Sequence, residues 1–232
     1  MSLYAIGDLH LSFETNKPMN VFGSKWNNYE EKLKQDWNEK VKKDDTIILL
    51  GDFSWATYLE DTEDDFKFLA SLPGNKIMLK GNHDYWWTTI NKMKKFLKEK
   101  GIENIDFLYN NSFLYNNYIL AGTRGWGVGE DADDIKVKKR EKIRLELSIQ
   151  DGVKKFGEDK KIIVCTHYPP FGATDIDTDL IDTMQKYKVE KCLYAHLHGE
   201  AHKDAVQGKI DGIEYVLLSS DYTDFKLVKI IE

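Results

Sequence analysis

Short polar motifs rich in histidine and aspartate recur along this chain, each at the end of an apolar run. Five of the six histidines lie in four of these motifs, and a fifth motif carries aspartate alone. Imidazole, carboxylate and amide oxygen suit divalent ions such as Mn, Fe, Co, Ni or Zn, and the missing thiolate disfavours a structural zinc site. The set predicts a two-metal hydrolytic centre. The motifs are Gly7-Asp8-Leu9-His10, Gly51-Asp52, Gly81-Asn82-His83-Asp84, Thr166-His167-Tyr168-Pro169 and Ala195-His196-Leu197-His198-Gly199.

The position of the motifs predicts that their side chains meet. In open α/β sheets, ligands gather beyond the carboxyl ends of the strands, and each motif directly follows a segment of strand length. Asp8 and His10 are two positions apart, as are His196 and His198, so in extended chain each pair projects to one side. A glycine before the first ligand, as at Gly51, lets the backbone turn sharply and approach an ion or phosphate closely.

Strand and helix patterns alternate through the first hundred residues, which predicts β-α-β crossovers and a largely parallel layer. The strands expected within 106–121 and in the last 30 residues have no helices between them, so we expect them to pair antiparallel. The whole is interpreted as an α/β fold of mixed sheets flanked by helices. No linker rich in Pro, Ser or Gly interrupts it, so residues 1–232 are expected to form one domain. Helices are expected at 29–43, 62–72, 88–100, 135–156 and 180–186, and further strands at 3–6, 46–50, 76–79, 161–166 and 192–195.

Composition and charge argue against some classes of function and location. A net charge of −6 argues against a non-sequence-specific nucleic-acid binder, although a nucleotide could still occupy a locally positive pocket. Cys165 and Cys192 lie inside apolar runs and are expected to be buried and reduced. The chain shows neither a signal peptide nor an apolar run of about 18 residues, so we expect no membrane span and a cytoplasmic location. Oligomeric state cannot be inferred from the sequence.

The order Asp-x-His, Gly-Asp, Gly-Asn-His-Asp, His and His-x-His, from Asp8 to His198, resembles the calcineurin-like metallophosphoesterase superfamily. The resemblance implies a four-layer α/β/β/α sandwich with two divalent metals at the sheet ends. It also implies that His83 contacts the phosphoryl group and assists the leaving oxygen, and that Asp84 orients His83. The implied ligands are Asp8, His10 and His198 for one metal, Asn82, His167 and His196 for the other, and Asp52 bridging both.

The chain departs from the family pattern in two places. Ala195 stands where the family often has glycine, a change expected to be tolerated if its backbone angle is ordinary. Phe53-Ser54-Trp55 follows Asp52, where protein Ser/Thr phosphatases of the superfamily carry Asp-Arg-Gly, which argues against a phosphoprotein phosphatase. The leading interpretation is hydrolysis of a small phosphate mono- or diester, or of a nucleotide, by a metal-bridging hydroxide. The alternatives are a nuclease and a catalytically silent metal-binding scaffold.

Several residues near the motifs have two interpretations. Arg124, after a predicted strand, could clamp a substrate phosphate beside Asn82 or form a surface salt bridge. Asp84 could instead cap the helix that starts near residue 88. His202 is expected in an exposed loop. Residues 12–28, with Trp26, are long enough for a lid. Four other tryptophans could either wall the substrate mouth or seal loops over the sheet edge; these are Trp55, Trp86, Trp87 and Trp126.

Overall fold

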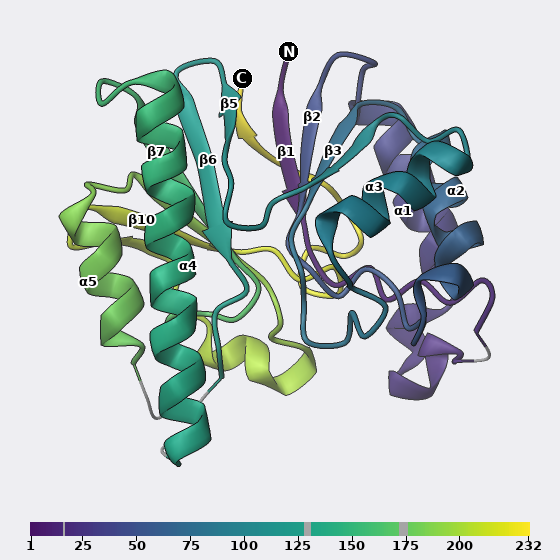
Figure 1. Cartoon of the computed structure of the whole chain (residues 1–232). Helices are drawn as coiled ribbons and strands as arrows, with labels where there is room; N and C mark the ends of the chain where they lie inside the picture. Colours follow the sequence, from purple (N-terminus) through teal and green to yellow (C-terminus); the bar gives the residue numbers. More distant parts are fainter. Residues whose placement is uncertain (16, 128–130, 172–175) are drawn as a thin grey trace.

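Two β-sheets pack face to face, and helices cover the outer face of each. A computed structural model describes residues 1–15, 17–127, 131–171 and 176–232, and Figure 1 shows these four layers side by side. The expected four-layer α/β/β/α sandwich is therefore confirmed. Among the described residues, none of the helices combines the length and hydropathy needed to cross a membrane.

The first sheet has the strand order β11-β1-β2-β3-β4. Strands β1 to β4 run parallel, and β11 pairs antiparallel with β1 at the edge. The parallel strands therefore deliver their carboxyl ends to the same edge. The strands are β1 Leu3–Ile6, β2 Thr46–Leu49, β3 Asn75–Met78, β4 Ile105–Phe107 and β11 Val228–Ile231.

The second sheet has the strand order β5-β6-β7-β8-β10-β9. Its four central strands are parallel, and the edge strands β5 and β9 pair antiparallel through hairpins with β6 and β10. The strands are β5 Phe113–Tyr115, β6 Tyr118–Thr123, β7 Lys161–Thr166, β8 Lys191–Tyr194, β9 Gly208–Ile210 and β10 Ile213–Leu217.

Helices α1, α2 and α3 cover the first sheet, and α4 and α5 cover the second (Figure 1). Four short 3-10 helices also occur within the described ranges. The α-helices are α1 Tyr29–Lys40, α2 Glu63–Ser71, α3 Ile90–Glu99, α4 Ala132–Phe156 and α5 Thr178–Lys186, and the 3-10 helices are η1 Met19–Phe22, η2 Ser24–Trp26, η3 Leu59–Thr62 and η4 Gly199–Asp204.

The strands are apolar on both faces because both faces are covered. In β1, Leu3 and Ala5 pack between the two sheets, whereas Tyr4 and Ile6 pack under the helices of the first layer. Cys165 is buried in the layer between the sheets, and both cysteines are free, as expected. Sheets packed this firmly give the loops at their ends a rigid base.

One pairing differs from the expectation. β4 was expected to pair antiparallel with the strands that follow it, but it lies parallel to β3 in the first sheet. Only the next strands behave as expected, since β5 and β6 form an antiparallel hairpin in the second sheet. The chain therefore crosses between the sheets after β4. In the same way, β10 is antiparallel to β9 but parallel to β8. The helix boundaries agree within a few residues.

Candidate metal centre

The predicted ligands follow the carboxyl ends of β1, β2, β3, β7 and β8, and they meet where the two sheets adjoin. Two groups form. Asp8, His10 and His198 make the first group, and Asp52, His167 and His196 make the second. Within each group the potential ligand atoms all lie within 4.8 Å of one another. Residues up to 190 positions apart in the chain are thus brought together, as the motif pattern predicted.

The backbone of the site is locally strained. Residues with a side chain rarely adopt positive φ, and such angles recur at functional sites. Four of the seven predicted ligands have them, so the sharp turns after the strands are made by the ligand residues themselves. These are Asp8 (58°), His10 (46°), Asp52 (50°) and His196 (74°).

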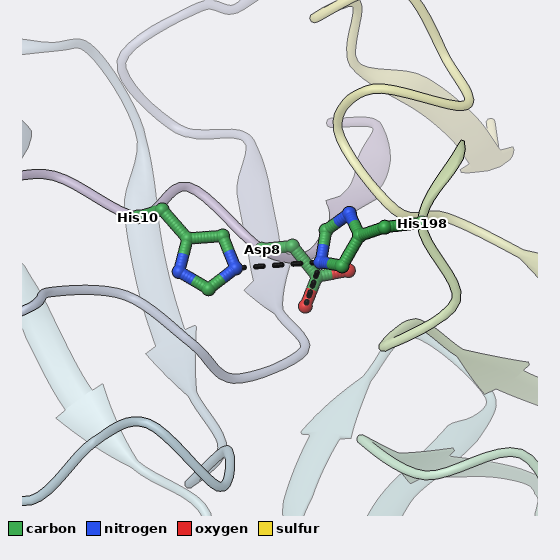
Figure 2. A group of neighbouring side chains, drawn as sticks. All are labelled: Asp8, His10 and His198. Carbon is green, nitrogen blue, oxygen red and sulfur yellow. Dashed lines mark hydrogen bonds and ion pairs between the residues drawn. The ribbon is translucent and has the colours of Figure 1, made fainter. Parts of the chain in front are cut away.

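Figure 2 shows the first group, in which two imidazole rings converge beside one carboxylate. The Nε2 atoms of His10 and His198 are 3.3 Å apart, and Asp8 Oδ1 lies 3.9 Å from His198 Nε2. Asp8 Oδ2 accepts a hydrogen bond from the backbone N–H of His196 (2.9 Å), which leaves Oδ1 buried without a hydrogen-bond partner among the described residues. A buried carboxylate oxygen without a donor is expected of a metal ligand.

In the second group, His167 has both ring nitrogens engaged. Its Nδ1 lies 2.9 Å from the carbonyl of Leu50, so Nδ1–H donates there and the lone pair is on Nε2. That Nε2 lies 2.6 Å from Asn82 Oδ1 and 3.2 Å from His196 Nδ1. An imidazole lone pair facing an amide oxygen would suit two ligands of one cation, because two acceptors do not otherwise attract each other.

Asp52 lies between the two groups. Its Oδ1 accepts a hydrogen bond from the backbone N–H of His83 (2.8 Å), which fixes the carboxylate. Its Oδ2 lies 3.8 Å from His10 Nε2 and 3.5 Å from His167 Nε2, one residue from each group. A single oxygen placed in this way could ligate both ions, which is the geometry that the bridging prediction requires.

The protonation of the ligands also fits metal binding. Burial lowers the pKa of His167 and of His196 to about 3, so both rings are neutral, as metal ligands must be. Burial raises the pKa of Asp8 to about 7, because charged Asp8 has little solvation. Burial opposes the charged form of His198, but Asp8 and Asp221 outweigh it and raise its pKa to about 9, so a metal would displace a proton there.

The glycines of the motifs allow the loops to approach one another. A Cβ added to Gly81 would lie 2.1 Å from Asp52 Oδ1 and 2.2 Å from Asp52 N, and one added to Gly7 would lie 2.4 Å from the Cβ of Ala195. The close approach that these two glycines allow is therefore between two ligand-bearing loops. Ala195 is fully buried and does not have positive φ, so its methyl group occupies the space that Gly7 leaves.

His83 and Asp84 diverge, although they are neighbours in the sequence. No hydrogen bond joins the Asp84 carboxylate to the His83 ring in the described part of the chain. The carboxylate accepts instead from the backbone N–H groups of Asp52, Phe53, Ser54 and Gly81 and from the indole N–H of Trp86. The helix-cap alternative is also not seen, because Thr89 caps α3. Asp84 therefore binds the Asp52 turn to the Gly81 turn.

Asp221 is a site residue that the motif analysis missed. It follows β10, and its carboxylate accepts a hydrogen bond from His198 Nδ1 (2.8 Å) and another from the N–H of Gly199 (3.1 Å). His202, expected in an exposed loop, is half-buried in η4 with Nε2 3.4 Å from the Asp221 carboxylate. The bond to Nδ1 directs His198 Nε2 toward Asp8 and His10, so Asp221 is a positioning residue.

Replacing Asp221 by alanine is expected to weaken metal binding by roughly 10- to 100-fold, because the His198 ring loses its orientation. Calorimetric titration of the metal-free protein with Mn²⁺ measures this affinity. Asp204→Ala is the matched control, since it removes an exposed carboxylate from the end of η4. An Asp221→Ala protein that binds Mn²⁺ as tightly as the control would show that Asp221 does not position the ligand.

An apolar cavity of about 340 Å³ opens beside the first group. His10, His83 and His198 line it together with aromatic and sulfur-containing side chains. Trp55 stacks on His10 at 4.9 Å between ring centroids and contacts His83 at 4.5 Å. Trp26 also lines this cavity, so the segment 12–28 contributes to its wall. Of the other tryptophans, Trp86 is buried in the core. The aromatic and sulfur-containing side chains that line the cavity are Met19, Phe22, Trp26 and Trp55.

A second cavity, of about 310 Å³, is lined by Arg124 and by Lys80, which directly precedes the Gly81-Asn82 motif. The Arg124 carbonyl accepts hydrogen bonds from the backbone N–H groups of His167 (3.1 Å) and Tyr168 (2.9 Å), and its guanidinium lies 4.6 Å from the ring centre of Trp126. Burial lowers its pKa. Neither an ion pair nor a side-chain hydrogen bond of Arg124 occurs among the described residues, so the surface salt-bridge alternative is not seen.

Comparisons with known proteins agree with this geometry. A model of the family described as calcineurin-like phosphoesterase matches residues 1–200. No curated protein gives a match. Solved structures with a similar fold include a protein of unknown function from Aquifex aeolicus (TM-score 0.55, 19% identity, covering 98% of this chain and 95% of that one). Phosphopantetheinyl hydrolase from Mycobacterium tuberculosis is also similar (TM-score 0.58, 13% identity, covering 99% and 95%). At these identities the likeness concerns the fold alone.

Proposed function

This chain belongs to the calcineurin-like phosphoesterase family, and on that premise we propose that it hydrolyses a phosphate ester of a small molecule with the help of two divalent metal ions. The observation that carries the proposal is the position of Asp52, whose Oδ2 lies within 4 Å of a histidine from each ligand group. The proposed ligands are Asp8, His10 and His198 for one ion, Asn82, His167 and His196 for the other, and Asp52 for both.

The donor set supports two ions of the Mn, Fe, Co, Ni or Zn kind. Bound ions would supply Lewis acidity and a water molecule activated near neutral pH. The protein itself contributes fixed ligands, because Leu50, Asp221 and the N–H of His83 each hold one ligand in a single orientation. We propose that residues 1–232 act as one domain, since the ligands come from both sheets.

We assign His83 as the residue that assists the leaving oxygen. Its ring lines the apolar cavity together with His10 and His198. Its Nδ1 is buried and makes no hydrogen bond with any described residue, so no neighbouring group competes with the substrate for this ring. General acid catalysis by a positioned imidazole contributes about 10²- to 10⁴-fold to rates. Asp84 acts indirectly, by fixing the turn on which Asp52 sits.

The apolar cavity supports a small organic substrate rather than a nucleic acid. Its walls of Trp26, Trp55 and Met19 offer flat and flexible apolar surface next to His83, where the leaving group would lie. The cavity volume of about 340 Å³ is that of a small-molecule site. A nuclease would need a basic track leading to the ligands, and no lysine or arginine is among the residues that line this cavity.

Hydrolysis of two chromogenic esters tests the proposal. The protein is stripped with a chelator, reloaded with Mn²⁺ and assayed with para-nitrophenyl phosphate and bis-para-nitrophenyl phosphate. Nitrophenolate release that requires the added metal is expected, and the ratio of the two rates distinguishes a monoesterase from a diesterase. If the protein binds about two ions per chain but releases nitrophenolate from neither ester, the scaffold alternative holds instead.

His83→Ala separates catalysis from metal binding in the same assay. The change is expected to lower kcat by roughly 10²- to 10⁴-fold while the metal content of the protein stays at the wild-type level. Elemental analysis measures the metal, and initial rates measure kcat. Tyr85→Ala is a suitable control, since Tyr85 is an exposed neighbour on the same loop. Equal kcat values for His83→Ala and the control would exclude His83 from the chemistry.

A further inference from the structure

The cavity that contains Arg124 is strongly basic, in contrast to the acidic chain around it. Four cationic side chains line it, and Glu141 is the single carboxylate among its lining residues. This leaves three unbalanced positive charges in about 310 Å³. The whole chain, by comparison, carries a net charge of −6. The four cationic residues are Lys80, Arg124, Arg140 and Arg144, and the cavity that they line is called the basic cavity.

Glu141 pairs closely with one of these cations and more weakly with a second. It is fully buried, and its carboxylate accepts hydrogen bonds from Thr123 Oγ1 (2.6 Å) and from Arg144 Nη1 (2.7 Å). Arg144 also donates to the hydroxyl of Tyr109 (2.9 Å), so it is held in place by the fold. Arg140 reaches Glu141 only through a longer contact (3.4 Å), and its side chain is 51% exposed. One carboxylate is thus shared by two guanidinium groups.

The other two cations have no anionic partner in the described part of the chain. Lys80 and Arg124 are half-buried, and neither side chain forms an ion pair or hydrogen bond with any described residue. The Nε atom of Arg124 is buried and has no hydrogen-bond partner among residues 1–15, 17–127, 131–171 and 176–232. Partly buried cations that face one cavity repel one another unless an anion joins them. The cavity therefore fits an anion that the described residues do not supply.

The place of this cavity in the fold ties it to the candidate metal centre. Lys80 directly precedes Gly81 and Asn82, and the Arg124 carbonyl accepts the N–H of His167. Asn82 and His167 both belong to the proposed second metal site. The apolar cavity, in contrast, is lined by His10 and His198 of the first site. The apolar cavity is thus lined by ligands of the first proposed site, and the basic cavity is lined by residues that adjoin ligands of the second along the chain or through a backbone hydrogen bond.

We propose that the basic cavity binds a second phosphate group of the substrate, separate from the one that is hydrolysed, so that the substrate is a small molecule with two phosphate groups. This inference rests on the proposed phosphoesterase function. Arginine donors match phosphate oxygens in pairs, and a dianion would balance most of the unpaired charge. Binding of the second phosphate in the basic cavity would hold the first phosphate in position at the metals.

Matched pairs of substrates test the proposal. Each pair consists of an α,ω-alkanediol bisphosphate and the corresponding hydroxyalkyl monophosphate, with chains of three, five and seven carbons. Release of inorganic phosphate by the Mn²⁺-loaded protein gives kcat/KM for each. We expect at least one bisphosphate to exceed its monophosphate by tenfold or more. If the monophosphates are hydrolysed as fast as the bisphosphates at every length, the proposal is wrong although the phosphoesterase function stands. If neither series nor a nitrophenyl ester reacts, the function itself fails.

A variant pair assigns the effect to the cavity. In Lys80→Gln/Arg140→Gln, the advantage of the bisphosphate should fall at least fivefold. Lys139→Gln removes an exposed positive charge from the residue next to Arg140 and should keep the advantage. A readout without catalysis uses inorganic pyrophosphate and the chelator-treated protein, where the double variant should bind at least fivefold more weakly than Lys139→Gln. Pyrophosphate binding that depends on the cavity, without any rate advantage of a bisphosphate, would identify a site for a free anion and overturn the proposal.

Discussion

Asp52→Asn is expected to abolish metal-dependent hydrolysis and to reduce the metal content of the protein at the same time. The substitution keeps the shape of the side chain and an oxygen that can accept the N–H of His83, now 2.8 Å from Oδ1. It removes the negative charge at Oδ2, the one oxygen close to ligands of both groups. We expect bound metal to fall from about two ions per chain to one or fewer, and kcat/KM to fall on the order of 10³-fold or more.

The stability of the Asp52→Asn protein gives a second and opposite readout. Without metal, burial raises the pKa of Asp52, so its charge destabilises the metal-free fold. The metal-free variant should therefore melt at the same temperature as the wild type or higher, whereas added Mn²⁺ should stabilise the wild type more. Asp64→Asn, at an exposed carboxylate, is the control. Equal stabilisation of all three proteins by Mn²⁺ would show that Asp52 is not a ligand.

Asp84→Asn is expected to destabilise the metal-free protein by about 1–3 kcal/mol, the usual range when buried hydrogen-bond donors lose their acceptor. Both carboxylate oxygens of Asp84 accept. Oδ1 accepts from Phe53, Ser54 and the Trp86 indole, and Oδ2 from Asp52 and Gly81. Asparagine has one acceptor and one NH2 group, so in either orientation its NH2 would face at least two N–H donors. The nearly isosteric change therefore isolates hydrogen bonding from packing.

Urea unfolding of chelator-treated protein measures this effect, with Asp64→Asn again as the control. The Asp64 side chain is 53% exposed and pairs with Lys67 on the surface, so its loss should change the free energy of unfolding by about 1 kcal/mol or less. We expect the Asp84 variant also to bind Mn²⁺ more weakly, because the turn that carries Asp52 loosens. Coincident unfolding curves for the two variants would contradict the proposal that Asp84 holds the two turns together.

The meeting of the ligands could be predicted because few positions in a parallel sheet can share a site. Asp8, Asp52 and His167 each follow an apolar strand directly, and the carboxyl ends of such strands share an edge. Side-chain direction is a different matter. Whether Asp84 points to His83 or to the backbone depends on the path of the Asp52 loop, which no local pattern encodes. The sequence therefore indicates the ligands more securely than it indicates the residues that support them.

Asp221 was missed although a signal for it was present. Ser219, Ser220 and Asp221 follow the apolar run of β10 in the way that the other motifs follow their strands. They contain neither a histidine nor a Gly-Asp pair, and each of the five motifs carries at least one of these features. The placement of β4 was wrong for another reason. A three-residue strand has no preference for one sheet over the other, and its pairing with β3 depends on how α3 returns the chain to the first sheet.

The left-handed backbone at Asp8, His10, Asp52 and His196 means that thermal stability and activity favour different residues at these positions. Glycine would adopt these angles without strain, and exchanging a buried carboxylate for glycine would also relieve charge repulsion in the metal-free fold. Selection for thermostability alone would therefore favour loss of the ligands, and only selection for activity retains them. Engineering of this scaffold should accordingly add stability far from the strand ends, for example in the helices of the two outer layers.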